Sequence, residues 1–396
     1  MTDLARADTA ERPRADRVPN ALRRAAPALL AYAAIRALGV VVLAVWSAAN
    51  GKDWHTLLAA RWDALWYTRV AEQGYGYTVH LADGDVHSNL AFFPLLPWLE
   101  RGLSALLPLS AADAGLVVSW TASLGAAWAL YATGERLHGP RAGVALAALW
   151  AAVPVGIVQS MAYSESLFTA LAAGGVLCVL SGRWVTAGVL ASLAGLTRPV
   201  GAAVVAAVWI TAAVTLWRAR PEGDGVRAIP WGRHRRMLLG VLLAPLGWLG
   251  YVLWVGARQG SLTGYFDVQG GWGNGFDGGL AFGRFIRDQL AGPAFLAGLA
   301  LLIGVALLVW LYVRTARRGQ PLPLLVYCGV VVLLALTAKG YFGSKPRLLM
   351  PAYPLLLPAA AALARWRPGR AWSLIGVIAA GSAVYGAFWL NGSGPP

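Results

Sequence analysis

The chain has 396 residues, of which 58% are hydrophobic and only 13% are charged, and its mean hydropathy is +0.57. Soluble globular domains carry about 25% charged residues, so this composition excludes an ordinary soluble protein. The formal charge of +15 does not indicate a nucleic-acid partner, because the arginines are scattered among short loops instead of gathered on one face.

The apolar runs are long enough for α-helices to cross about 30 Å of hydrocarbon, and they lack the short alternating segments of an outer-membrane barrel. We therefore predict an all-α polytopic membrane protein with about 11 transmembrane helices. The predicted spans are residues 26–48, 111–131, 143–162, 166–181, 184–197, 199–217, 237–257, 293–313, 322–338, 348–364 and 371–390.

Residues 1–25 are polar and rich in arginine, and no small-residue cleavage site precedes the first span. They predict a disordered cytoplasmic tail, followed by a single transmembrane domain over 26–390 and a short tail over 391–396. With a cytoplasmic N-terminus, 21 of the 33 Lys and Arg residues fall on the cytoplasmic side and 11 outside, while Arg36 lies within the first span. This imbalance follows the positive-inside rule, and the Arg- and Ala-rich composition suggests a bacterial plasma membrane.

This topology leaves two long external segments, 49–110 and 258–292. The first contains RWDALWYTRVAEQGYGY at 61–77, which predicts an interfacial amphipathic helix whose Trp and Tyr side chains lie at the headgroup level. Asp63 is either the N-cap of this helix or a site carboxylate, and Tyr67 shares a turn with it. Residues 92–108 are read as not crossing the membrane; if they cross, the count of spans changes by about one or two.

Several other charged residues are expected at the same external face. Glu165 lies in a short bend with Ser164. It is either a solvated charge at a helix N-terminus, favoured by the helix dipole, or a functional-site residue, as ionisable groups near membrane depth are candidates for that role. Arg198 precedes Pro199, which breaks the helix, and a guanidinium there could snorkel or bind a phosphate bidentately. Lys345 and Arg347 oppose the positive-inside trend, which a phosphate clamp would explain.

The second external segment is rich in Gly and aromatic residues and contains Asp267; it is either a lid or a long connection. His55, His80 and His87 lack metal-ligand spacing, so we predict no zinc site. Asp83 and Asp85 fit a turn as well as a metal-binding DxD, so the sequence supports no metal site but leaves assistance by a divalent metal open. P-loop, serine-hydrolase and zincin motifs do not occur in the sequence.

Four sequence blocks, in their order and spacing, resemble the PIG-V or GPI mannosyltransferase II family and its bacterial relatives over roughly residues 26–217. The blocks are RWDALWYTRVAEQGYGY, NLAFFPLLPWLERGLSALL, YSESLFTALAAGG and LAGLTRPVG. RWD-x-x-W-Y with FFPL-x-P is the specific part, whereas the last two blocks are weak alone. The resemblance implies a GT-C glycosyltransferase with a polyprenyl-phosphate-linked sugar donor, and it implies that Asp63 is the base or positioning carboxylate.

A phosphate leaving group needs no acid, whereas the incoming hydroxyl benefits from a base, so Asp63 with nearby cations suits transfer from a lipid-linked sugar. We predict an inverting mannosyltransferase that acts on a lipid or glycan acceptor at the extracytoplasmic face, without a cofactor. The alternatives are a transporter or flippase for a lipid-linked sugar and a GT-C transferase for arabinose or a protein acceptor. Asp63 is the predicted catalytic residue, and the substrate- or phosphate-binding candidates are Arg61, Trp62, Tyr67, Glu165, Arg198, Asp267, Lys345 and Arg347.

Overall fold

The computed structural model describes residues 17–82, 84–219 and 231–395. The predicted disordered tail falls largely outside this part of the chain, as does Asp83. The predicted all-α polytopic fold is confirmed: the described chain is dominated by helices, and its strands form two short antiparallel pairs.

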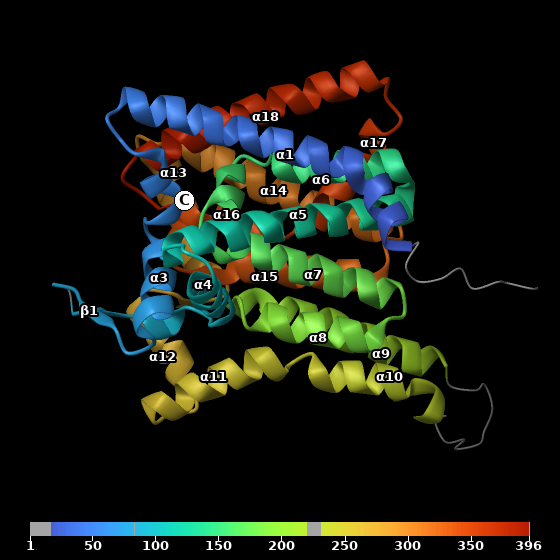
Figure 1. Ribbon diagram of the computed structural model, residues 1–396, viewed down its shortest axis with the longest axis horizontal. Coiled ribbons are helices and arrows are strands. Elements are labelled where there is room, and N and C mark those ends of the chain that lie inside the picture. The colour runs from blue at the N-terminus through green and yellow to red at the C-terminus, as the bar shows by residue number, and fades with distance from the viewer. Residues whose placement is uncertain (1–16, 83, 220–230, 396) are drawn as a thin grey trace, which may run out of the picture.

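The long helices lie side by side and form the body of the molecule (Figure 1). In chain order, these bundle helices are α1 (Arg17–Ala49), α5 (Ala111–His138), α6 (Pro140–Ala151), α7 (Ser164–Leu180), α8 (Trp184–Gly195), α9 (Ala202–Arg218), α10 (Trp231–Leu243), α11 (Leu246–Gln259), α14 (Phe295–Arg317), α15 (Leu322–Thr337), α17 (Leu357–Leu363) and α18 (Pro368–Asn391).

Shorter elements connect them. These are α2 (Trp54–Ala59), α3 (Asp63–Gln73), β1 (Thr78–His80), β2 (Val86–Ser88), η2 (Asn89–Ala91), α4 (Leu95–Leu106), η3 (Gly156–Ser160), η4 (Pro199–Gly201), α12 (Gly264–Gly271), β3 (Gly275–Phe276), α13 (Leu280–Ala291), β4 (Ala338–Lys339), η5 (Phe342–Ser344), α16 (Lys345–Leu349) and η6 (Tyr353–Leu356).

Within the described residues, six helical stretches are long and apolar enough to cross a membrane, and four shorter apolar stretches accompany them. The six are Ala21–Ala49, Ala111–His138, Pro199–Arg218, His234–Gln259, Phe295–Arg317 and Pro368–Asn391. The shorter four are Ser164–Leu180, Trp184–Gly195, Leu322–Thr337 and Tyr353–Leu363. The chain is therefore a multi-pass membrane protein, as predicted.

Two predicted spans are broken in the structure. The span predicted over 143–162 ends as an α-helix at Ala151, and the chain continues through Pro154 into η3. The span predicted over 348–364 is divided among α16, η6 and α17, with Pro351 between α16 and η6 and Pro354 in the first turn of η6. Proline lacks the N–H that continues a helix and clashes with the preceding turn, so each break lies at a proline. Helix α1 begins earlier than predicted, at Arg17.

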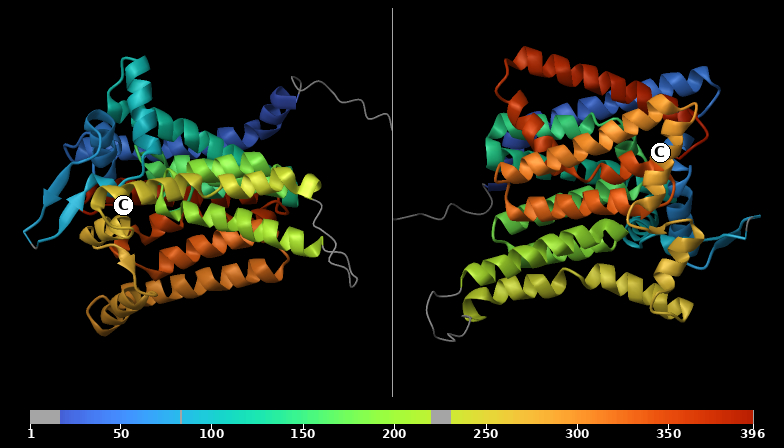
Figure 2. Two further views of the ribbon diagram at one scale, coloured as in Figure 1. Left: turned by 90° about the horizontal axis from the view of Figure 1, so that it is seen from below. Right: turned by 180° about the vertical axis from the view of Figure 1, so that it is seen from behind.

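Helices α10 and α11 continue in one direction as the stretch His234–Gln259 (Figure 1), whereas the other neighbouring spans run in opposite directions. The links between the spans therefore alternate between two ends of the bundle. Helices α2, α3, α4, α12 and α13 and the β1–β2 hairpin gather at one end, which we call the loop end (Figure 1). The hairpin projects from the bundle there (Figure 2), with Val79 opposite His87. Helix α4 has 12 residues and reaches only about 18 Å, too short to span, in agreement with the non-crossing interpretation of 92–108.

The opposite end carries many arginines. It holds the turn between α5 and α6, the turn between α7 and α8, and the link between α14 and α15 (Figure 1). Arg136 lies in the last turn of α5, Arg183 lies between α7 and α8, and Arg317 is the last residue of α14. The arginines that charge counting assigns to the cytoplasm therefore lie away from the loop end.

The main core lies between the bundle helices and consists largely of Ala, Val and Leu side chains, with Trp150 and Tyr163 among the fully buried residues. Small residues let helices approach closely. A side chain on Gly188 of α8 would collide with the backbone of Gly240 on α10, so this crossing requires glycine. The tight packing holds the ends of the helices in fixed relative positions.

Candidate active site

Asp63 is the first residue of α3, and Trp62 occupies the cap position before it. The Ala64 N–H donates to the Arg61 carbonyl oxygen at 3.2 Å, which closes a tight turn over 61–64, and the Asp63 N–H donates to the Tyr163 hydroxyl at 3.3 Å. The Asp63 carboxylate is therefore not the N-cap that one interpretation of the sequence suggested. Its Oδ2 atom instead forms an ion pair with the Arg347 Nη1 at 2.9 Å, and the side chain is 25% exposed.

Glu165 lies in the first turn of α7, where the helix dipole favours a negative charge. Its carboxylate is buried, with only 1% of the side chain exposed, and its Oε1 atom is shared by two guanidinium groups. One is Arg198, which contacts it through Nη1, and the other is Arg347, whose Nε lies 3.4 Å away. A buried carboxylate is retained at this position because two cations compensate its charge.

Arg347 joins the two carboxylates. It belongs to α16, which follows the end of α15, and its guanidinium contacts both Asp63 and Glu165 while its carbon Cζ lies 5.2 Å from the centre of the Tyr163 ring. Burial alone would lower the pKa of this guanidinium, but the Asp63 and Glu165 carboxylates outweigh burial and raise the pKa above its ordinary value. The group is a permanent cation between two anions.

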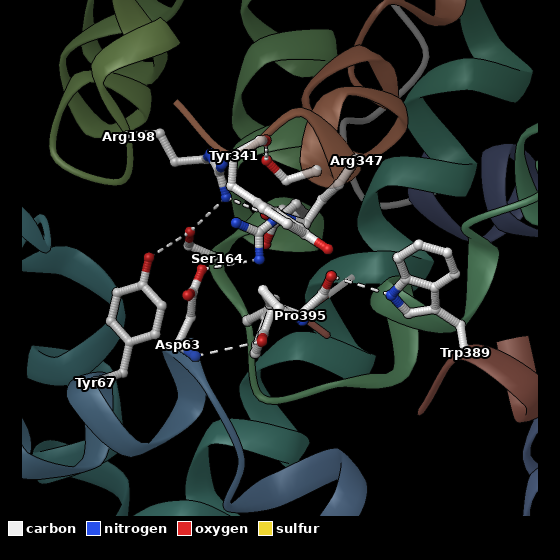
Figure 3. A network of polar contacts seen from close by, with 11 residues as sticks. Asp63, Tyr67, Ser164, Arg198, Tyr341, Arg347, Trp389 and Pro395 are labelled. Atoms are coloured by element: carbon white, nitrogen blue, oxygen red, sulfur yellow. Dashed lines mark hydrogen bonds and ion pairs between the residues drawn. The ribbon is translucent and has the colours of Figure 1, made fainter. Parts of the chain in front are cut away.

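Arg198 lies just before η4 and points toward Ser164 (Figure 3). Pro199 ends the preceding helical run and leaves Arg198 in an extended conformation, from which Nη1 also reaches the Ser164 Oγ at 3.2 Å. The Tyr67 hydroxyl lies 2.7 Å from the same Oγ. Tyr67 is buried, and burial is the main cause that raises the pKa of its phenol, so Tyr67 acts as a neutral hydrogen-bonding group.

Four predicted candidates thus converge at the loop end: Asp63, Glu165, Arg198 and Arg347 (Figure 3). We call them the charge cluster. Two carboxylates and two guanidinium groups balance in formal charge, and of the four side chains Asp63 is the most exposed. The arrangement offers one accessible carboxylate beside guanidinium groups of the kind that bind phosphate.

Arg61 and Trp62 flank the cluster but have other contacts. The Arg61 guanidinium donates to the carbonyl oxygens of Leu390 at 2.7 Å and Gly392 at 2.8 Å, at the end of α18. Its Cζ lies 3.9 Å from the centre of the Trp62 ring. Neither side chain makes a hydrogen bond or ion pair with the charge cluster that the structure describes, although both adjoin Asp63 in the chain.

Lys345 and Asp267 are not brought into the charge cluster. The Lys345 Nζ donates to the carbonyl oxygens of Ala335 and Ala338 at 2.5 and 2.6 Å, and so satisfies the C-terminal end of α15. Burial lowers the pKa of this ammonium, although Asp277 opposes the shift. Asp267 lies on α12, where its carboxylate accepts the Thr263 hydroxyl at 3.4 Å. The substrate contacts proposed for both residues stay predictions.

The second long segment packs onto the first near α3. The Trp272 Nε1 donates to the Ser88 carbonyl oxygen at 3.0 Å, and its ring lies edge-on to Trp66 at 4.8 Å and stacks on His87 at 4.0 Å. The Gln269 amide donates to the Ala91 carbonyl oxygen at 3.2 Å. These contacts explain how a segment predicted as a lid or connection covers the loops beside the cluster; whether it moves stays a prediction.

Two residues beside the cluster were not among the predicted site residues. Tyr163 places its hydroxyl on the Asp63 N–H and its ring face near Arg347, and Ser164 links Tyr67 to Arg198. Both immediately precede Glu165, which is the signal that could have identified them. Among the described residues, no group of three or more His, Cys, Asp or Glu side chains is placed to hold a metal ion.

No protein-family model matches the sequence. No curated protein matches it either. Solved structures similar to it include ArnT from Cupriavidus metallidurans bound to undecaprenyl phosphate, which is 14% identical, with 87% of this chain and 62% of that chain covered and a TM-score of 0.52. The apo state of that ArnT is 16% identical, with 78% of this chain and 56% of that chain covered and a TM-score of 0.49. The apo form of the Archaeoglobus fulgidus oligosaccharyltransferase is 14% identical, with 92% of this chain and 56% of that chain covered and a TM-score of 0.47.

The chain spans less than two thirds of the length of each of these proteins. The neighbours are GT-C glycosyltransferases. At 14% identity, the likeness to ArnT with undecaprenyl phosphate establishes a shared fold alone. The narrower resemblance to PIG-V stays a prediction.

Proposed function

We propose that this protein is an integral membrane glycosyltransferase that takes mannose from a polyprenyl-phosphate donor and transfers it, with inversion, to a lipid or glycan acceptor at the extracytoplasmic face. One observation carries the proposal: Arg347 joins the partly exposed Asp63 to the buried Glu165 at one end of a bundle of membrane-length helices. A lipid-linked sugar presents its phosphate at that depth, with its chain in the bilayer.

The leaving phosphate is the role for which the two arginines are suited. A guanidinium can bind phosphate oxygens bidentately and carries its charge at every working pH. Arg198 and Arg347 are held by Glu165 and Asp63, so a bound donor phosphate competes with these carboxylates for the guanidinium groups. The competition matters most at Asp63, because its contact with Arg347 lies at the more exposed side of the cluster.

In the proposed reaction, Asp63 accepts the proton of the acceptor hydroxyl. The hydroxyl oxygen forms a bond to the anomeric carbon while the bond from that carbon to the phosphate oxygen breaks, and the electron pair leaves with the polyprenyl phosphate. Positive charge from Arg347 stabilises the developing phosphate charge. A single displacement inverts the anomeric centre, and no acid is needed because phosphate is a good leaving group.

Two further points support the choice of donor and face. The ArnT structure of similar fold contains undecaprenyl phosphate, a polyprenyl phosphate. The end of the bundle opposite the loop end carries many arginines, which by the positive-inside rule supports an extracytoplasmic position of the charge cluster. Mannose as the sugar rests on the resemblance of RWDALWYT and FFPLLP to the PIG-V family.

A donor comparison tests the proposal. Membranes containing the protein are given radiolabelled polyprenyl-phosphomannose, polyprenyl-phosphoarabinose or GDP-mannose, and labelled lipid, glycan and protein are separated. We expect transfer from polyprenyl-phosphomannose to a lipid or glycan and none directly from GDP-mannose. Transfer of arabinose would change the proposed sugar, and labelling of protein would change the proposed acceptor. In both cases the protein would still be a glycosyltransferase that uses a polyprenyl-phosphate donor.

A transporter or flippase is the competing function. It requires polar side chains along the membrane depth, whereas the ion pairs of the charge cluster gather at one end of the bundle. Liposomes with the purified protein and a fluorescent lipid-linked sugar distinguish the two. Movement of the intact lipid between leaflets without cleavage of the sugar phosphate would overturn the transferase.

A further inference from the structure

The backbone at Trp62 has an unusual conformation. Its φ of 52° makes it the one non-glycine residue with positive φ among residues 17–82, 84–219 and 231–395, and its ψ is −121°. With the hydrogen bond from the Ala64 N–H to the Arg61 carbonyl oxygen, these angles define a type II′ turn with Trp62 at its first central position. That position normally takes glycine, because any Cβ there is crowded by the backbone.

The side chains on either side of this peptide hold the turn in place. The Trp62 indole packs against the main core of the bundle, and the Arg61 guanidinium lies over its ring. The same guanidinium donates to the carbonyl oxygens of Leu390 and Gly392, so the turn is tied to the end of α18. A guanidinium that already makes two carbonyl hydrogen bonds and an aromatic contact is poorly placed to bind a substrate phosphate.

The residue that follows the strained turn is Asp63. If Trp62 relaxed to a negative φ, the chain would leave the turn in another direction, and α3 would no longer begin with the Asp63 carboxylate 2.9 Å from Arg347. Strained backbone that the surroundings enforce is concentrated at functional sites, where it fixes a reactive group. Here the strain immediately precedes the carboxylate that the proposed function requires.

We infer that Arg61 and Trp62 are positioning residues, which act through the type II′ turn to set the orientation of Asp63, and that they do not bind the substrate. The inference rests on the proposed function for its kinetic part only. Its structural part, that Trp62 occupies a position suited to glycine, holds whatever the reaction is.

The structural part is tested by thermal melting of the purified protein in detergent. Trp62→Ala and Trp62→Gly both remove the indole, and in ordinary backbone glycine is the less stable of the two. We expect Trp62→Gly to melt at a higher temperature than Trp62→Ala, because glycine adopts the turn without strain. A lower melting temperature for Trp62→Gly would overturn the inference even if the protein transfers no sugar.

The kinetic part is tested with Arg61→Ala and Arg61→Lys in the mannose-transfer assay. A small displacement of a catalytic group lowers the rate by about 100-fold, so we expect Arg61→Ala to lower kcat by that order with the KM for polyprenyl-phosphomannose changed less than about two-fold. Arg61→Lys keeps the charge but lacks the planar guanidinium, so its kcat should lie between those of the wild type and Arg61→Ala. Arg287→Ala, an exposed arginine of α13 that pairs with its neighbour Asp288, is the matched control.

The outcomes separate the inference from the proposed function. A raised KM with unchanged kcat in Arg61→Ala would assign Arg61 to donor binding and overturn the inference, while the transferase stands. Full activity in Arg61→Ala would overturn it as well. A wild-type protein that transfers no sugar would refute the proposed function, and the order of melting temperatures would still decide the structural part.

Discussion

Replacing Glu165 with glutamine tests the charge cluster most severely, because this carboxylate is only 1% exposed and serves two arginines. Breaking a buried ion pair by removing one partner costs about 3–5 kcal/mol. Two features reduce that value: Arg347 keeps Asp63 at 2.9 Å, and a glutamine amide oxygen can accept a hydrogen bond from a guanidinium group, worth about 1.5–3 kcal/mol. The net expectation is a loss of about 2 kcal/mol of unfolding free energy, most of it at Arg198.

The assay is equilibrium unfolding in mixed detergent–SDS micelles. Asp288→Asn is the matched control, since it removes an exposed carboxylate from its pair with Arg287 and should cost less than about 1 kcal/mol. The double variant Glu165→Gln with Arg198→Gln removes the uncompensated charge and should recover part of the loss, with a coupling of about 0.5–3 kcal/mol. Equal losses for Glu165→Gln and Asp288→Asn would refute the reasoning.

Two further predictions concern residues beside the site. Glu100 is buried on α4 with neither carboxylate oxygen hydrogen-bonded, and burial, with the nearby Glu72, raises the pKa of its carboxyl well above its ordinary value. The unfolded chain therefore ionises first, so stability falls as the pH rises above about 4.3. Glu100→Gln should melt above wild type at about pH 8 and like wild type near pH 4, and equal melting at both would contradict this. Lys345→Met should lower the melting temperature, because the carbonyl oxygens of Ala335 and Ala338 lose their hydrogen-bond donor. The KM for the lipid-linked sugar should stay unchanged. A KM raised about ten-fold in a folded variant would instead identify Lys345 as a phosphate ligand.

The general architecture could be predicted from composition and span length, because a bilayer imposes both. The breaks within spans were less predictable. Pro154 and Pro351 interrupt helices that hydropathy alone treats as continuous, and hydropathy does not register the missing N–H of proline. The break at Pro154 matters for the site, since it is followed by the η3 segment that leads to Tyr163 and Glu165.

Topology placed Asp63, Glu165, Arg198 and Arg347 at one end of the bundle, and the structure brings them into contact. Which of these side chains pair with one another could not be predicted from the sequence, because the pairing depends on how segments far apart in the chain pack together. Lys345 was predicted together with Arg347 and diverges from it.

The divergence of Lys345 and Arg347 has a simple geometric cause. Both belong to α16, and side chains two positions apart on a helix point to opposite sides. Arg347 therefore faces the carboxylates while Lys345 reaches the end of α15. The strained turn at Trp62 had no sequence signal at all, since positive φ is expected at Gly, Asn or Asp and not at tryptophan.

The central claim is that Asp63 accepts the proton of the acceptor during transfer from a polyprenyl-phosphate sugar. The most direct measurement is the rate of radiolabelled mannose transfer from saturating polyprenyl-phosphomannose by Asp63→Asn, with folding checked by melting. Arg347 retains Glu165 in this variant, so we expect it to fold. The account predicts a rate lowered by about 100-fold or more, the contribution typical of a general base. A folded Asp63→Asn protein that transfers mannose at the wild-type rate would contradict it.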